Sequence, residues 1–113
     1  MNASVKRQFG SFAEFYRFYL TEHLNPTCRK LHFAGTSLLL AIGIAMIATR
    51  QWWLAWLMPI AGYGFAWTGH YFFEKNRPAT FTYPGWSFIA DFVMYWQLLT
   101  GKIPFEERNP RAG

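Results

Sequence analysis

Two long uncharged apolar runs, joined by only two residues, are the feature that most constrains how this chain folds. The first run is Phe33–Thr49 and the second is Trp52–Phe73, with Arg50 and Gln51 between them. A helix that crosses a bilayer needs about 17–25 apolar residues. The two runs therefore predict a transmembrane helical hairpin with its turn at Arg50-Gln51.

An amphipathic helix is predicted before the hairpin. Ser11 and Glu14 have the spacing of a capping box, in which side chains cover free backbone N–H groups at a helix start. The aromatic residues that follow recur at helical spacing, and His23 is the next position on that stripe. The helix should end near Asn25-Pro26, because the residue before a proline disfavours the helical region. We expect this helix to lie on the membrane or against the other helices.

A third apolar segment, from about Pro84 to Thr100, carries one charge and is expected to span the membrane or to re-enter it. The chain is thus predicted to be a small all-α membrane protein. We expect a single integral membrane domain over residues 1–113, with frayed ends at 1–10 and 102–113. Lysine and arginine gather before and after the hairpin, whereas its turn holds only Arg50, so both termini should be cytoplasmic.

The composition agrees with a membrane protein and argues against nucleic-acid binding. The chain is 52% hydrophobic, 21% aromatic and 15% charged, with a net charge of +5. Its basic residues lie at the ends of the apolar runs, so membrane lipids with anionic head groups are the expected partners. Cys28 is the only cysteine, which excludes an intrachain disulfide.

The three histidines, His23, His32 and His70, fall at one depth of the predicted hairpin. His32 lies about 18 residues before the turn and His70 about 19 after it. At about 1.5 Å of rise per residue, the two reach the same level. His23 is joined to His32 by a short break and can fold back to that level. All three can therefore converge at the cytoplasmic end and ligate a metal ion.

Two carboxylates can join the histidines. Glu74 lies four residues after His70, on the same face if the helix continues that far. Asp91 lies in the third apolar segment, where a buried carboxylate needs a partner. Imidazole and carboxylate together suit Fe(II), Zn or Mn. We expect Glu74 or Asp91 to complete or orient the shell, although Lys75 and Arg77 offer Glu74 an ordinary charged partner.

Other interpretations stay open from the residues alone. The protein can be a non-enzymatic membrane or lipid-binding protein, in which the histidines are polar side chains at the bilayer boundary. A metal hydrolase would use the same ligands without O₂. Cys28, with a histidine nearby, is a conceivable nucleophile, although a lone cysteine is usually inert packing.

Two stretches of the sequence carry a family resemblance. They are FYRFYLTEHLNPTCRKLHFAGT and GYGFAWTGHYFFEKNRPATFTYP. The pattern H-x-N-P, followed by His32, and the pattern G-H-x-x-F-E-x-x-R-P-A resemble the membrane-protein family that includes the yeast 2-hydroxy fatty acid dioxygenase. The resemblance runs from about Phe15 to Gly101. The chain departs from the family in being shorter than the eukaryotic enzyme and in having Leu24 where some members have a second histidine.

The resemblance implies an Fe(II)-dependent dioxygenase that shortens a 2-hydroxy fatty acid by one carbon. His23, His32 and His70 would be its catalytic metal ligands. The expected partners are a fatty acyl substrate and O₂, and the protein can form a homo-oligomer. The acyl tail would lie along the apolar helices, and the substrate carboxylate would pair with Arg29, Lys30 or Arg77.

Overall fold

The structure, a computed structural model, describes residues 9–106 and has only helical elements over that range. The α-helices are α1 (Phe12–Thr21), α2 (Pro26–Thr49), α3 (Leu57–Gly69) and α4 (Pro84–Leu99). The 3-10 turns η1 (Trp52–Trp56) and η3 (Ala79–Phe81) precede α3 and α4, and a π-helical turn, η2 (His70–Glu74), extends α3. The all-α prediction is confirmed for the residues described.

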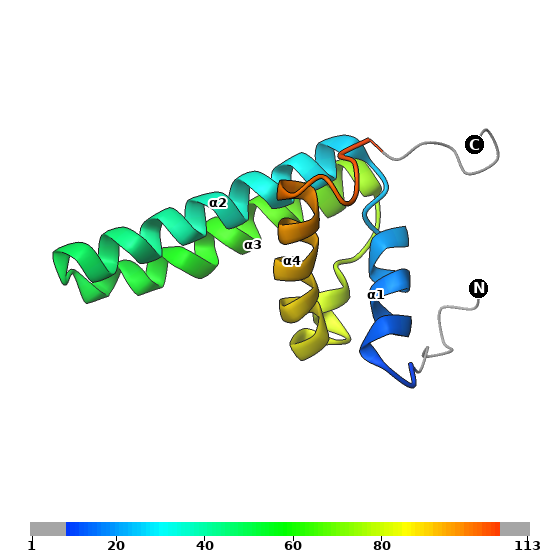
Figure 1. Ribbon diagram of the computed structural model, residues 1–113, viewed down its shortest axis with the longest axis horizontal. Helices are drawn as coiled ribbons and strands as arrows, with labels where there is room; N and C mark the ends of the chain where they lie inside the picture. Colours follow the sequence, from blue (N-terminus) through cyan, green and yellow to red (C-terminus); the bar gives the residue numbers. More distant parts are fainter. Residues whose placement is uncertain (1–8, 107–113) are drawn as a thin grey trace.

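Helices α2 and α3 lie side by side along their whole length, and α1 and α4 lie at the end of this pair opposite its turn (Figure 1). The turn falls where the sequence predicted it, since Arg50 adopts the left-handed conformation that ends α2. Pro59 does not break the second arm because it lies in the first turn of α3, where a backbone N–H has no helical partner in any case.

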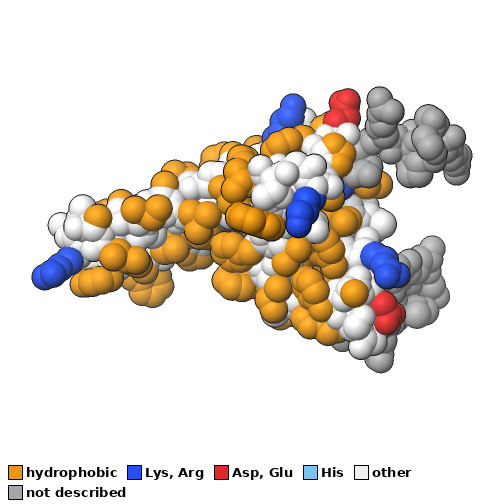
Figure 2. Space-filling view, in the orientation of Figure 1, with side chains coloured by type: hydrophobic (Ala, Val, Ile, Leu, Met, Phe, Trp, Pro, Cys, Tyr) orange, Lys and Arg blue, Asp and Glu red, His pale blue; other side chains and the backbone are white. Residues whose placement is uncertain are grey.

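Of the helices described, one is long and apolar enough to cross a membrane, namely α2 with 24 residues. The second arm is divided between η1 and the 13 residues of α3, and α4 has 16 residues. A spanning role for α3 and α4 therefore stays a prediction. Hydrophobic side chains cover the hairpin in Figure 2, with a basic side chain at its tip.

The boundaries of the first two helices differ from the prediction. Helix α1 ends at Thr21, so His23 lies in the connection to α2 rather than on the aromatic stripe of a longer helix. Helix α2 already begins at Pro26, inside the segment expected to be a break. The reason is local, because proline is favoured at the first helical position and the Asn25 side chain accepts hydrogen bonds from the N–H groups of Thr27 and Cys28.

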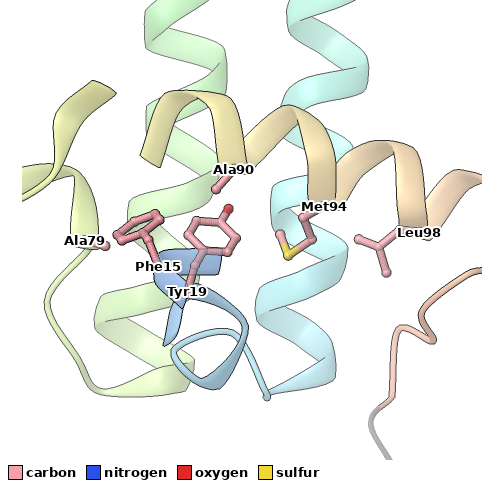
Figure 3. Packing of buried hydrophobic residues seen from close by; sticks show 6 residues of the cluster. All are labelled: Phe15, Tyr19, Ala79, Ala90, Met94 and Leu98. Carbon is pink, nitrogen blue, oxygen red and sulfur yellow. The ribbon is translucent and has the colours of Figure 1, made fainter. Parts of the chain in front are cut away.

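Helices α1 and α4 are held together by a small apolar core. The rings of Phe15 and Tyr19 on α1 are almost fully buried and pack against residues of α4 and the loop before it (Figure 3). These partners are Ala79, Ala90, Met94 and Leu98. Burying one such large side chain contributes roughly 1.5–3 kcal/mol. The core thus fixes α1, and with it the connection that carries His23.

The two ends were expected to be frayed, but parts of them pack on this core. Phe9 lies against it from the N-terminal side, and Ile103 and Phe105 lie against it from the C-terminal side. Residues 1–8 and 107–113 lie outside the described residues, so for them the expectation stays a prediction.

Gly35 sets how closely the two arms of the hairpin approach. A Cβ atom at this position would lie 2.8 Å from the Cβ of Phe65 and 3.2 Å from the carbonyl oxygen of Ala61. We expect Gly35→Ala to destabilise the protein by about 1–3 kcal/mol, because the arms must separate. Thermal unfolding of the detergent-solubilised chain measures the change.

Gly64→Ala is the matched control for Gly35→Ala. Gly64 lies on α3, and a Cβ there would meet no described atom within 4 Å. Since alanine favours helix over glycine by up to about 1 kcal/mol, this variant should be neutral or more stable. Equal thermal unfolding midpoints for Gly35→Ala and Gly64→Ala would contradict the close approach of the two arms at Gly35.

Candidate metal centre

The three histidines converge from three different elements into one buried cluster. His23 lies between α1 and α2, His32 on α2, and His70 at the start of η2, and they are only 1%, 6% and 2% exposed. One ring nitrogen from each lies within 4.8 Å of the others. The convergence expected from the equal depth of the histidines is thus what the fold produces.

A hydrogen bond to Nδ1 orients each ring. His23 Nδ1 lies 2.6 Å from the carbonyl oxygen of Tyr19, and His32 Nδ1 lies 2.9 Å from that of Cys28. His70 Nδ1 lies 2.7 Å from the side-chain oxygen of Asn76. Since all three partners are acceptors, each Nδ1 carries the proton and donates. Each Nε2 is left with a free lone pair, the form in which histidine binds a metal.

The three Nε2 atoms face one another. His23 Nε2 is 3.1 Å from His32 Nε2 and 2.8 Å from His70 Nε2. Lone pairs at this distance repel each other unless a proton or a metal ion lies between them. Burial, followed by the neighbouring histidines, lowers the pKa of His23 well below its ordinary value, which disfavours the proton. The residues therefore fit a metal ion.

The three imidazole ligands limit which metal ions this site can bind. Neutral imidazoles suit Fe, Zn, Cu and Ni, whereas Mg and Ca prefer oxygen ligands. Among the described residues, the cluster that meets metal-ligand geometry consists of the three histidines and includes no carboxylate. Three protein ligands leave further positions for small molecules, as at catalytic rather than structural metal sites.

Asp91 lies near the cluster but acts through Tyr19. The Tyr19 hydroxyl donates a hydrogen bond to the Asp91 carboxylate. The Tyr19 ring stacks on His23 with the ring centroids 4.0 Å apart, and its carbonyl oxygen holds His23 Nδ1. The carboxylate thus fixes the residue that contacts His23, and the orienting role expected of Asp91 stays a prediction.

Glu74 lies outside the histidine cluster. Its carboxylate accepts a hydrogen bond of 2.7 Å from the backbone N–H of Asn25, and burial raises its pKa above the ordinary value. The contact ties the end of the second arm to the connection that carries His23. Glu74 thus supports the position of two histidines at once.

The three cations expected to bind the substrate carboxylate differ in their surroundings. Arg29 is 1% exposed and donates hydrogen bonds of 2.6 Å to the carbonyl oxygens of His23 and Pro104. Lys30 is exposed, and the guanidinium of exposed Arg77 lies over the Phe81 ring. Arg29 therefore braces the His23 connection against the C-terminal segment.

Asn76 is the residue of the centre that sequence reasoning missed. Its side-chain NH₂ donates to the Glu22 carbonyl oxygen, which turns its oxygen toward His70. The chain returns there because η2 is wound as a π-helix and Lys75 adopts the left-handed conformation. The only signal in the sequence is an amide six residues after His70, ahead of Arg77-Pro78.

A comparison with protein families identifies the family of this chain. A family model described as 2-hydroxy-palmitic acid dioxygenase Mpo1-like matches residues 9–103. The chain belongs to this family. The Mpo1-like match includes all three histidines, Asn76 and Asp91, and it bears out the resemblance carried by the two quoted motifs. No curated protein and no solved structure matches the chain.

Removing the Asn76 side chain should weaken metal binding without removing a ligand. We expect Asn76→Ala to lower the affinity for Fe(II) or Zn by about 10- to 100-fold, because His70 loses the acceptor that orients it. Titration of protein prepared without a His tag, followed by metal analysis, gives the affinity. Gln51→Ala, which removes an exposed amide at the far tip of the hairpin, should leave it unchanged. An unaltered affinity in Asn76→Ala would show that this hydrogen bond is dispensable.

Proposed function

We propose that this protein is a membrane-bound, Fe(II)-dependent dioxygenase that shortens 2-hydroxy fatty acids by one carbon. The observation that carries the proposal is the meeting of three buried, unprotonated Nε2 atoms in a member of the Mpo1-like family. Fe(II), when bound there, supplies the redox chemistry by which O₂ oxidises the substrate. O₂ balances the conversion of a 2-hydroxy acid into carbon dioxide, water and an acid one carbon shorter.

The surroundings of the histidines support an oxidative reaction. The three histidines are almost fully buried, and residues of α1 and α4 line the same chamber as they do. This burial keeps bulk water away from the cluster. Tyr19 and Asn76 hold His23 and His70 through their Nδ1 atoms. Rings fixed in this way need little reorganisation when ligands bind.

An apolar cavity beside the cluster supports an acyl substrate. It encloses about 230 Å³ between α2, α3 and α4, and His32 and Asp91 form part of its wall. On α3 its lining extends from Ala66 back to Met58 and Pro59. His70 and Met58 are separated by about 18 Å at 1.5 Å per residue. We infer that the acyl tail lies in this cavity with its head at the histidines.

The exposed surface supports a place in the membrane. Apolar side chains on the outer part of the hairpin face outward, among them Ile44, Ile47 and Ile60. In the proposed arrangement α2 crosses the bilayer, the turn lies on the far side, and both termini are cytoplasmic. A fatty acyl substrate would then enter from the surrounding lipid.

The iron requirement tests the chemistry. We expect the wild-type protein to bind about one Fe(II) per chain and to consume O₂ with 2-hydroxypalmitate. His70→Ala should lose both Fe(II) binding and O₂ consumption, because one of the three metal ligands is gone. Oxygen uptake and metal analysis of the same preparation measure them. Tyr71→Ala, which changes the exposed neighbour of His70, should retain both. Protein that recovers no iron under anaerobic Fe(II) addition would instead favour a lipid-binding protein without catalysis.

The far end of the cavity should set the length of the acyl chain. We expect Met58→Trp to lower the rate with long 2-hydroxy acids by about tenfold or more while sparing short ones, because the ring fills space that a long tail needs. Ile60→Trp is the control, since Ile60 is 67% exposed and lines a different surface of the hairpin. The measurement is the rate of O₂ consumption with 2-hydroxy acids of a series of chain lengths. An unchanged profile in Met58→Trp would place the tail elsewhere.

A further inference from the structure

Two buried hydrogen-bond donors near the metal centre have no partner within residues 9–106. They are the indole N–H of Trp67 on α3 and the hydroxyl of Ser87 on α4. Ser87 is only 3% exposed. A buried polar group left without a partner costs about 1–3 kcal/mol, so such groups in a folded protein usually mark a place where a ligand or water binds.

Both residues line the same small chamber. Its volume is about 20 Å³, and its wall includes Trp67, Ser87 and all three histidines. This space holds little more than one water-sized group. The chamber shares His32, Tyr63, Ala66 and Asp91 with the apolar cavity. A ligand with a long apolar tail in the cavity would therefore place one polar atom of its head in the chamber and the rest of the head at the wall that the two spaces share.

The donors and acceptors of the chamber are complementary to those of one kind of ligand head group. Trp67 and Ser87 offer donors, and the Asp91 carboxylate, which accepts from Tyr19, has lone pairs left to accept another hydrogen bond. A 2-hydroxy carboxylate carries the complementary groups, with acceptor oxygens on C1 and a hydroxyl donor on C2. We propose that Trp67 and Ser87 donate hydrogen bonds to one carboxylate oxygen of the substrate, which enters the chamber, and that Asp91, at the wall shared with the apolar cavity, accepts a hydrogen bond from the 2-hydroxyl group.

This inference rests on the proposed function and replaces the cations expected to bind the carboxylate. Arg29, Lys30 and Arg77 are not among the residues that line the chamber or the apolar cavity. The Asp91 carboxylate should also make the site bind 2-hydroxylated acids more tightly than unhydroxylated ones. An unhydroxylated fatty acid brings a negative charge close to Asp91 without a donor for it, which costs binding free energy.

The test measures binding rather than turnover. The full chain, loaded with Fe(II) under anaerobic conditions in detergent, is titrated calorimetrically with 2-hydroxypalmitate and with palmitate. We expect wild-type protein to bind 2-hydroxypalmitate at least tenfold more tightly. Ser87→Ala and Trp67→Phe should each weaken its binding by about 10- to 100-fold, because a hydrogen bond to a charged group is lost. Ser87→Thr, which keeps the hydroxyl, should retain most of the affinity.

Two variants serve as matched controls. Ser37→Ala removes a hydroxyl that pairs with Tyr95 outside the chamber, and Trp56→Phe changes an indole that is 77% exposed. Both should bind 2-hydroxypalmitate as wild type does. Metal content and thermal midpoint, recorded for every variant, separate loss of substrate from loss of the site.

The outcomes are distinguishable. Wild-type protein that holds Fe(II) but binds no 2-hydroxypalmitate would overturn both the proposed function and this inference. Unchanged affinity in Ser87→Ala and Trp67→Phe would overturn the inference alone and would indicate that water satisfies the two donors. Loss of metal from either variant would assign it to support of the histidines and would also overturn the inference.

Discussion

The mutual approach of three Nε2 lone pairs is the interaction on which the rest of this structure depends. Left to themselves, three neutral imidazoles in this arrangement repel one another. The fold holds them with Nδ1 hydrogen bonds to Tyr19, Cys28 and Asn76. Much of the remaining architecture braces those acceptors. Asp91 fixes the Tyr19 side chain, and Arg29 and Glu74 bind the connection that holds His23.

The two ends of the α2/α3 hairpin differ in their surroundings. The outer part of the α2/α3 hairpin buries little of its apolar surface, whereas α1 and α4 lie across its other end (Figure 1), where the three histidines are buried. A helix surface this apolar is unfavourable in water but costs nothing in lipid. The same arrangement leaves an apolar cavity whose wall includes His32 and Asp91, and under the proposed function this cavity would take up a substrate from the bilayer.

Local signals in the sequence predicted much of this fold. The Ser11 cap, the turn at Arg50 and the start of α4 at Pro84 all lie where the residue pattern placed them, because each depends on backbone preferences of a few residues. The convergence of His32 and His70 followed from counting residues along two antiparallel helices. The predicted start of α2 is wrong because helix formation depends on the cap at Asn25 and not on where the charged residues end.

The sequence by itself determined the helices, the hairpin and the three histidines as the candidate ligands, since these follow from periodicity and spacing. Only the tertiary structure decided which groups surround them. Asn76 reaches His70 through a π-helical turn, Asp91 reaches His23 through Tyr19, and Trp67 and Ser87 line one chamber from different helices. The contacts of Asp91, Trp67 and Ser87 involve residues far apart in the chain and depend on how α1 and α4 pack against the hairpin, which no local pattern specifies.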